Sequence, residues 1–252
     1  MSAVIHDDFR FRPRHRSRLR LPLWIGLLVI VLPALWWLFD ALTDPRFMPV
    51  SAVRVEGEFK HQTRAQLHAA IADYAAGGFF SVDVDAVRRA ALGLPWVASA
   101  SVRRVWPDTL QVAVVEHQPV ARWGESALLN HHGMVFAPPI DSFPPGLPLL
   151  SGPSGLATSM LERVAKINSA LQPLRQHVQR VTLDERRAWS VTLNNGVELL
   201  LGREEMDARV QRYVHAYPSA LALHVTQLAA VDLRYTNGFA ARWAPAVTTG
   251  LR

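Results

Sequence analysis

The stretch VRRVWPDTLQVAVVEHQPVARW, residues 102–123, predicts a β-hairpin that organises the sequence around it. Its apolar residues recur at every second position, the period of a strand with one buried face: Leu110, Val112 and Val114. A turn signal, Trp106-Pro107-Asp108, precedes this strand, and residues 97–105 before it favour a second strand. We therefore predict strands at 97–105 and 109–116, joined by that turn.

One strand and two helices are predicted upstream of the hairpin. Residues 50–56 alternate apolar and polar side chains and are followed by a glycine, which indicates a strand and a turn. Thr63 to Gln66 fits a capping box that opens a helix, and Gly77-Gly78 ends it. A shorter helix begins after Asp83, which is placed as its N-cap. The predicted order is β-α-α-β-β.

This order resembles a POTRA domain, a topology that outer-membrane assembly and secretion proteins share. Within it, residues 102–123 resemble the core of the FtsQ/DivIB family of bacterial cell-division proteins. The matching residues are Trp106-Pro107, the strand Leu110 to Val114, Glu116, Pro119 and Ala121-Arg122-Trp123. The W-P turn, the E-x-x-P and the A-R-W at this spacing are more specific than the topology alone.

The chain after Trp123 predicts a mixed β-domain with two helices. Its strands are predicted at 127–130, 134–136, 178–183, 188–193, 197–201, 229–235 and 239–243. One helix is opened by a Ser159–Glu162 capping box, and a second runs over 204–217 and is ended by Pro218. Residues 138–153 are interpreted as a proline-rich loop.

This part resembles the β-domain that follows the POTRA domain in the same family. The resemblance rests on Gly202-Arg203, Tyr217-Pro218, residues 231–235 (VDLRY), Gly238 and residues 243–245 (WAP). The predicted fold class is α+β, with a single transmembrane helix, a POTRA domain and a mixed β-domain with two helices. The predicted parts are a basic cytoplasmic tail 1–20, a transmembrane helix 21–40, a POTRA domain 48–118, a β-domain 119–245 and a flexible tail 246–252.

Residues 21–39, LPLWIGLLVIVLPALWWLF, carry no charge and follow a tail with six arginines. As a helix they would be about 28 Å long, close to the ~30 Å hydrocarbon core of a bilayer. Arginine-rich segments stay on the cytoplasmic side, which predicts a single-pass type II protein with residues 1–20 in the cytoplasm and the chain after Asp40 outside. The family resemblance implies that the membrane is the inner membrane and that the bulk of the chain lies in the periplasm. The alternative is a cleaved signal peptide, but the run is long for one and ends in Trp36, Trp37, Leu38 and Phe39 without small residues for cleavage.

The charge and the cysteine count exclude several classes of protein. The chain has a net charge of +6, of which the tail supplies +4 through six arginines against Asp7 and Asp8, so +2 remains for the rest. Such a distribution predicts contact of the tail with membrane lipid and no nucleic-acid partner. With no cysteine in the chain, neither disulfides nor thiol chemistry are available.

The sequence predicts neither an enzyme nor a cofactor, metal or small-molecule site. It lacks H-E-x-x-H, G-x-S-x-G, a phosphate-binding loop and S-x-x-K. His131-His132 is expected to be a solvated turn whose rings point to opposite sides, and Asp83 with Asp85 the start of a helix. Arg103-Arg104 is interpreted as a solvated strand segment. The tryptophans at 96, 106 and 123 are expected to pack in the core or at a turn.

The final predicted hairpin is the candidate binding site. A last strand tends to lie at a sheet edge, where its unpaired backbone groups accept a strand from another chain. Two alternatives are that its aromatic residues only pack the domain, and that the tail 246–252 covers the edge. The family resemblance implies that this end binds FtsB together with FtsL, through Arg234, Tyr235, Asn237, Gly238, Phe239 and Trp243. Asn237 and Phe239 differ from the small residues expected there, so they either contact the partner or shape the turn.

The sequence thus favours a non-catalytic scaffold that links early septal proteins to FtsB-FtsL and to septal peptidoglycan synthesis at the division septum. The alternative is a POTRA-containing chaperone or secretion accessory for exported polypeptides. Against it, no series of ~10-residue alternating strands of an outer-membrane barrel follows the POTRA segment. Midcell enrichment of a fluorescent fusion would favour the scaffold, whereas a uniform envelope signal would favour the alternative.

Overall fold

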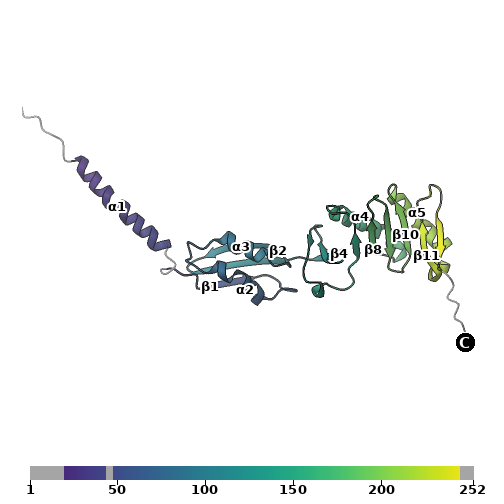
Figure 1. Cartoon of the computed structure of the whole chain (residues 1–252), viewed down its shortest axis with the longest axis horizontal. Helices are drawn as coiled ribbons and strands as arrows, with labels where there is room; N and C mark the ends of the chain where they lie inside the picture. Colours follow the sequence, from purple (N-terminus) through teal and green to yellow (C-terminus); the bar gives the residue numbers. More distant parts are fainter. Residues whose placement is uncertain (1–19, 44–47, 245–252) are drawn as a thin grey trace, which may run out of the picture.

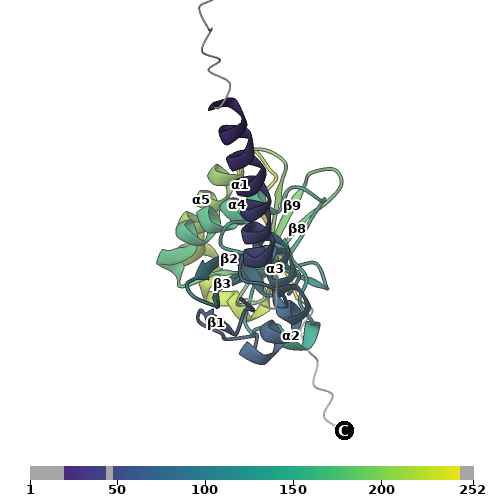
Figure 2. The same ribbon diagram turned by 90° about the vertical axis from the view of Figure 1, so that its left-hand side faces the viewer.

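The computed structural model describes residues 20–43 and 48–244. A long helix, a three-stranded sheet with two helices and a nine-stranded sheet follow one another along the longest axis (Figure 1). Figure 2, which views the chain from the helix side, shows the two sheet-containing domains behind that helix. The predicted tails 1–20, apart from Arg20, and 246–252 lie outside the described residues.

The first helix, α1 (Arg20–Thr43), contains the predicted transmembrane segment. Its window Trp24–Ala41 has a mean hydropathy of 1.9, and none of that window is buried against the rest of the chain. Because apolar side chains cover it on all sides, this helix has no one-sided apolar stripe of the kind that packs on a soluble core. It is long and apolar enough to cross a membrane.

The first domain has the predicted order β-α-α-β-β. Its elements are β1 (Ala52–Glu56), α2 (Arg64–Ala75), α3 (Val84–Leu92), β2 (Val97–Val105) and β3 (Thr109–Glu116). The sheet order is β1-β3-β2, with β1 parallel and β2 antiparallel to the central β3. The alternating residues of β3 are buried, as predicted, in one core with Leu67, Ile71 and Val87 of the helices. The N-caps Thr63 and Asp83 are confirmed.

The second domain is built on one mixed sheet of nine strands in the order β12-β11-β10-β9-β8-β7-β4-β5-β6. The strands are β4 (Pro119–Trp123), β5 (Ala127–Asn130), β6 (Val135–Phe136), β7 (Leu149–Ser151), β8 (Val178–Leu183), β9 (Trp189–Leu193), β10 (Glu198–Gly202), β11 (Leu228–Asp232) and β12 (Ala240–Trp243). The helices α4 (Ala157–Leu171) and α5 (Met206–Ala216) share one apolar core with this sheet. The predicted α+β fold class is confirmed.

Part of the predicted proline-rich loop forms a strand inside the nine-stranded sheet. Residues 149–151 form β7, which pairs in parallel with β4 on one side and β8 on the other. Leu150 is fully buried there. The sequence could not show this strand, because three residues are too few for an alternating pattern. The interpretation of 138–153 as a loop was therefore wrong at this point.

One of the predicted helix boundaries was also wrong, and a second agrees with the structure. Helix α4 begins at Ala157 with Leu156 at its N-cap and no side-chain cap, so Ser159 lies inside the helix. The predicted end of the second helix before Pro218 is confirmed, because α5 ends at Ala216 with Tyr217 as its C-cap; further helical turns follow at Tyr217–Leu221 and Ala222–Gln227. Proline is tolerated there because the first residues of a helical turn need no N–H donor.

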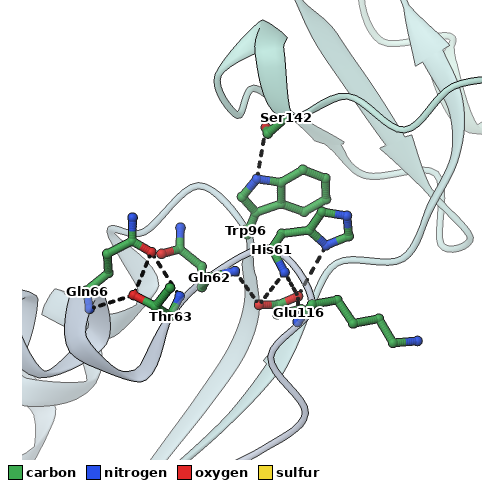
Figure 3. A network of polar contacts seen from close by, with 8 residues as sticks. His61, Gln62, Thr63, Gln66, Trp96, Glu116 and Ser142 are labelled. Atoms are coloured by element: carbon green, nitrogen blue, oxygen red, sulfur yellow. Dashed lines mark hydrogen bonds and ion pairs between the residues drawn. The ribbon is translucent and has the colours of Figure 1, made fainter.

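Trp96 joins the two domains (Figure 3). Although it precedes β2, its indole is 2% exposed and belongs to a small core with Leu128 and Phe136 of the second domain. The indole Nε1 donates to Ser142 Oγ at 3.2 Å, and the His61 ring stacks on the indole at 3.7 Å between ring centres. We call these five residues the joint cluster. Their contacts connect segments that are far apart in the sequence.

Glu116, at the end of β3, fixes the loop that carries His61. Its carboxylate accepts the backbone N–H groups of Lys60, His61 and Gln62 at 2.9–3.3 Å, and the His61 ring lies 3.3 Å from it (Figure 3). Burial alone would raise the pKa of Glu116, but these hydrogen bonds outweigh it and hold the pKa below its ordinary value of 4.5. The glutamate of the E-x-x-P pattern therefore has a structural role beside the joint cluster.

We expect Glu116→Gln to lower the free energy of unfolding at pH 7 by roughly 1–3 kcal/mol, because the amide replaces a buried charged acceptor. Since the pKa of Glu116 is lowered in the folded state, its stabilisation is complete above about pH 4.5 and is lost as the pH falls below that value. The variant should therefore show a shallower loss of stability in acid. Urea unfolding of residues 45–252 between pH 3 and pH 7, with the exposed-site variant Glu185→Gln as control, measures this. Identical acid profiles for Glu116→Gln and the parent would contradict it.

Candidate functional site

The strand β12 forms one edge of the nine-stranded sheet. It pairs antiparallel with β11, from Asp232 opposite Ala240 to Leu228 opposite Trp243, and no described strand lies on its other side. Three of its four residues are exposed. An edge strand presents unpaired backbone N–H and C=O groups that can hydrogen-bond an added strand. The predicted edge position of the last strand is thus confirmed for the described residues, while the tail 246–252 lies outside them.

The connection between β11 and β12 is longer than the three residues, 236–238, that separate the two predicted strands. β11 ends at Asp232 and not at Tyr235, so residues 233–239 form the connection. Asp232 Oδ1 accepts the backbone N–H of Arg234 at 3.0 Å, and the Arg234 guanidinium donates to both carboxylate oxygens at 2.9 and 2.7 Å. Such local side-chain bonds compete with the strand ladder, which explains the early end of β11.

The Asp232–Arg234 pair is a stable ionic contact at the start of this connection. The hydrogen bonds from the Arg234 side chain hold the pKa of Asp232 below its ordinary value, although partial burial alone would raise it. The same carboxylate raises the pKa of Arg234. Both groups are therefore charged at neutral pH, and the Arg234 side chain, 60% exposed, is already paired within the chain.

Arg212 of α5 holds the rest of the connection. Its guanidinium donates to the backbone carbonyls of Tyr235, Thr236 and Gly238 at 2.7, 2.9 and 3.1 Å. Three charge-assisted bonds from one planar group fix the geometry of this segment before any partner binds. Sequence reasoning missed Arg212, because an arginine on a helix face gives no signal that it will bind carbonyls more than 20 residues away.

The six predicted contact residues have different surroundings. Tyr235 is 57% exposed and lies in the connection before β12, whereas Trp243 is 45% exposed and is the last residue of β12. Asn237 is also exposed. Phe239 is partly buried and packs against the core of the second domain, so its role includes shaping the connection. Gly238 is half-buried and contributes a carbonyl to Arg212.

Leu223 is an exposed apolar residue in the segment that contacts Trp243, and it was not predicted from the sequence. It is 85% exposed and directly precedes His224, whose ring meets the Trp243 indole edge-on at 5.9 Å. An exposed leucine in a segment that contacts an exposed tryptophan at a sheet edge favours a contact surface for another protein. Only the helical turns after Pro218 bring Leu223 there.

The other sequence candidates have structural roles. Asp83 caps α3, because its Oδ1 accepts the N–H groups of Asp85 and Ala86. The rings of His131 and His132 lie 3.8 Å apart, so the expectation that they point to opposite sides was wrong. The residues that the structure describes contain no group of three or more His, Asp or Glu arranged to hold a metal ion. Trp123 packs against the second core as expected, while Trp106 is 76% exposed at its turn.

Two family models match this chain. The model described as "Cell division protein FtsQ/DivIB, C-terminal" matches residues 121–234, and "POTRA domain, FtsQ-type" matches residues 48–117. The match to the first domain agrees with its observed β-α-α-β-β order. Of the candidate contact residues, only Arg234 lies within a matched range.

Curated relatives named "Cell division protein FtsQ" match most of the chain. The protein from Allochromatium vinosum is 38% identical over 236 residues, which cover 94% of each chain. The protein from Shewanella oneidensis is 39% identical over 248 residues, 96% of this chain and 94% of that one. The protein from Coxiella burnetii is 36% identical over 202 residues, 80% and 83% of the two chains. With these identities along nearly its whole length, the chain belongs to the FtsQ/DivIB family of bacterial cell-division proteins.

Proposed function

We propose that this chain is a non-catalytic scaffold of the division machinery in the inner membrane. It links early septal proteins to the FtsB-FtsL complex, and through that complex to septal peptidoglycan synthesis. Membership of a cell-division family supports this role. Two structural features also support it. The two domains are joined through packed aromatic residues, and one edge of the second domain's sheet carries exposed aromatic residues.

The proposed topology has the N-terminus in the cytoplasm and both domains in the periplasm, at the division septum. It is supported by the position of six arginines directly before the apolar helix α1. The domains would then lie on the same side of the membrane as the external parts of other single-pass division proteins. Tethering to one membrane raises the effective concentration of such partners, so each contact can be weak.

FtsB, in company with FtsL, is proposed to dock at β12 by strand addition. The observation that carries this proposal is that β12 is an edge strand whose connection to β11 is already held by Arg212. A pre-organised edge reduces the entropy cost of binding. The added strand would gain backbone hydrogen bonds, and Tyr235 and Trp243 would supply aromatic contacts at the two ends.

Hydrogen exchange tests the binding mode. On mixing residues 45–252 with a soluble FtsB segment, the backbone N–H groups of Ala240–Trp243 that point away from β11 should exchange at least about tenfold more slowly, because an added strand hydrogen-bonds them. The opposite edge strand, β6 (Val135–Phe136), is the internal control and should keep its rate. Binding without protection of β12, for example by a helix lying over Leu223 alone, would rule out strand addition.

A further inference from the structure

Three exposed aromatic side chains lie at the end of the first domain that faces α1. They are Tyr74, Phe80 and Trp106, which are 53%, 48% and 76% exposed. They come from three separate segments: the last turn of α2, the loop before α3 and the turn between β2 and β3. None of these side chains belongs to the apolar core of the domain, so core packing does not explain why they are aromatic.

Backbone hydrogen bonds bring these segments together around the start of the domain. The N–H of Val50 donates to Gly77, the N–H of Phe79 donates to Met48, and the N–H of Ser51 donates to Asp108, at 3.0, 2.7 and 3.0 Å. Residues 48–51 therefore run between the loop that carries Phe80 and the turn that carries Trp106. Tyr74 lies three residues before Gly77, at the same end of α2.

Arg104 fixes the loop that carries Phe80. Its guanidinium donates to the carbonyls of Phe79 and Val82 at 2.8 and 2.6 Å, which overturns the expectation that Arg104 is only solvated. The ring of Phe80 also meets the buried ring of Phe79 edge-on at 5.2 Å. Phe80 is thus held at the surface in a defined position, and it does not fold back into the core.

The chain itself keeps this end of the domain close to α1. The helix ends at Thr43 and the domain is described from Met48, five Cα steps later. Five steps span at most about 18 Å even when fully extended. The apolar window Trp24–Ala41 ends only two residues before Thr43. If α1 spans the bilayer, the aromatic end of the domain must therefore remain near the membrane surface.

We propose that Trp106 and Phe80, with Tyr74, dock the first domain onto the lipid surface. Aromatic rings are favoured at the headgroup region, where their apolar parts leave water and the polar groups of Trp and Tyr stay hydrated. The contact would orient the domain and carry the second domain, with its β12 edge, away from the bilayer. The proposal rests on α1 being a membrane anchor and not on the binding proposed for β12.

The absence of cysteine makes a direct test practical. The full chain carrying Ser81→Cys, next to Phe80, is labelled with an environment-sensitive fluorophore and placed in nanodiscs of phosphatidylcholine and phosphatidylglycerol. Some lipids carry a nitroxide near the headgroup, which quenches the fluorophore on contact. We expect strong quenching at position 81 and none in the control Asn195→Cys, on an exposed turn of the second domain.

A second variant tests whether the aromatic residues cause the contact. Phe80→Ser with Trp106→Ser, in the Ser81→Cys background, should reduce the quenching to well below that of the Ser81→Cys chain, because the loop is then only tethered near the lipid and no longer in contact with it. Both side chains are exposed, so the circular dichroism of the chain should not change. Equal quenching at positions 81 and 195 would overturn the proposal, and so would strong quenching that persists in the double serine variant.

Discussion

Replacing Trp96 with alanine should lower the free energy of unfolding of residues 45–252 by about 3–5 kcal/mol, the range for a large buried aromatic residue. The indole is 2% exposed and contacts both domains at once. Its removal would leave a cavity beside Leu128 and Phe136, and it would also remove the stacking partner of His61 and the hydrogen-bond donor to Ser142. No other described tryptophan is buried to this extent.

Urea unfolding followed by circular dichroism measures this loss. Because the joint cluster couples two otherwise separate cores, we also expect the variant to unfold in two resolved transitions where the parent shows one. Trp106→Ala is the matched control: its side chain is 76% exposed, and its effect should stay within about 0.5 kcal/mol. A Trp96→Ala variant that unfolds like the control would show that the two domains do not stabilise each other.

Alanine at both Tyr235 and Trp243 should nearly abolish binding of a soluble FtsB segment. Aromatic residues that anchor an interface often contribute 2 kcal/mol or more, which corresponds to about 30-fold in Kd for each. Tyr235 lies in the connection before β12 and Trp243 is the last residue of the strand, so their effects should add to about 1,000-fold. Both are exposed, so the folded domain itself should lose little stability.

Isothermal titration calorimetry of residues 45–252 with the FtsB segment measures the Kd of the parent and of the double alanine variant. Met134→Ala is the matched control, because Met134 is also a large exposed side chain, 46% exposed, but lies beside β6 at the opposite edge of the sheet. It should bind like the parent. If the double alanine variant also binds like the parent, the proposed docking at β12 fails.

The elements of the first domain were predictable because their signals are local. Alternation within β3, the capping box at Thr63 and the N-cap at Asp83 each involve residues a few positions apart. In the second domain the same logic found most strands and the final hairpin. It failed where the signal was too short, as at β7, or where a cap-like sequence lay inside a helix, as at Ser159.

The candidate site was predictable only in outline. The sequence indicated a last strand with aromatic residues near both ends, and the family resemblance implied which residues to name. That β11 ends at Asp232, that Phe239 turns toward the core and that His224, next to Leu223, contacts Trp243 depend on contacts the sequence pattern does not contain. The same holds for Arg212, whose three acceptors lie 23–26 residues away in the chain.

By itself, the sequence determined the apolar anchor, the β-α-α-β-β order and the family, because hydrophobic periodicity, helix caps and turn residues act over a few neighbouring positions. Only the tertiary structure decided the order of the nine strands, the place of β12 at the edge and the joint at Trp96. These features arise from packing and hydrogen bonds between distant segments. Their free energy depends on the whole fold, so no local pattern can specify them.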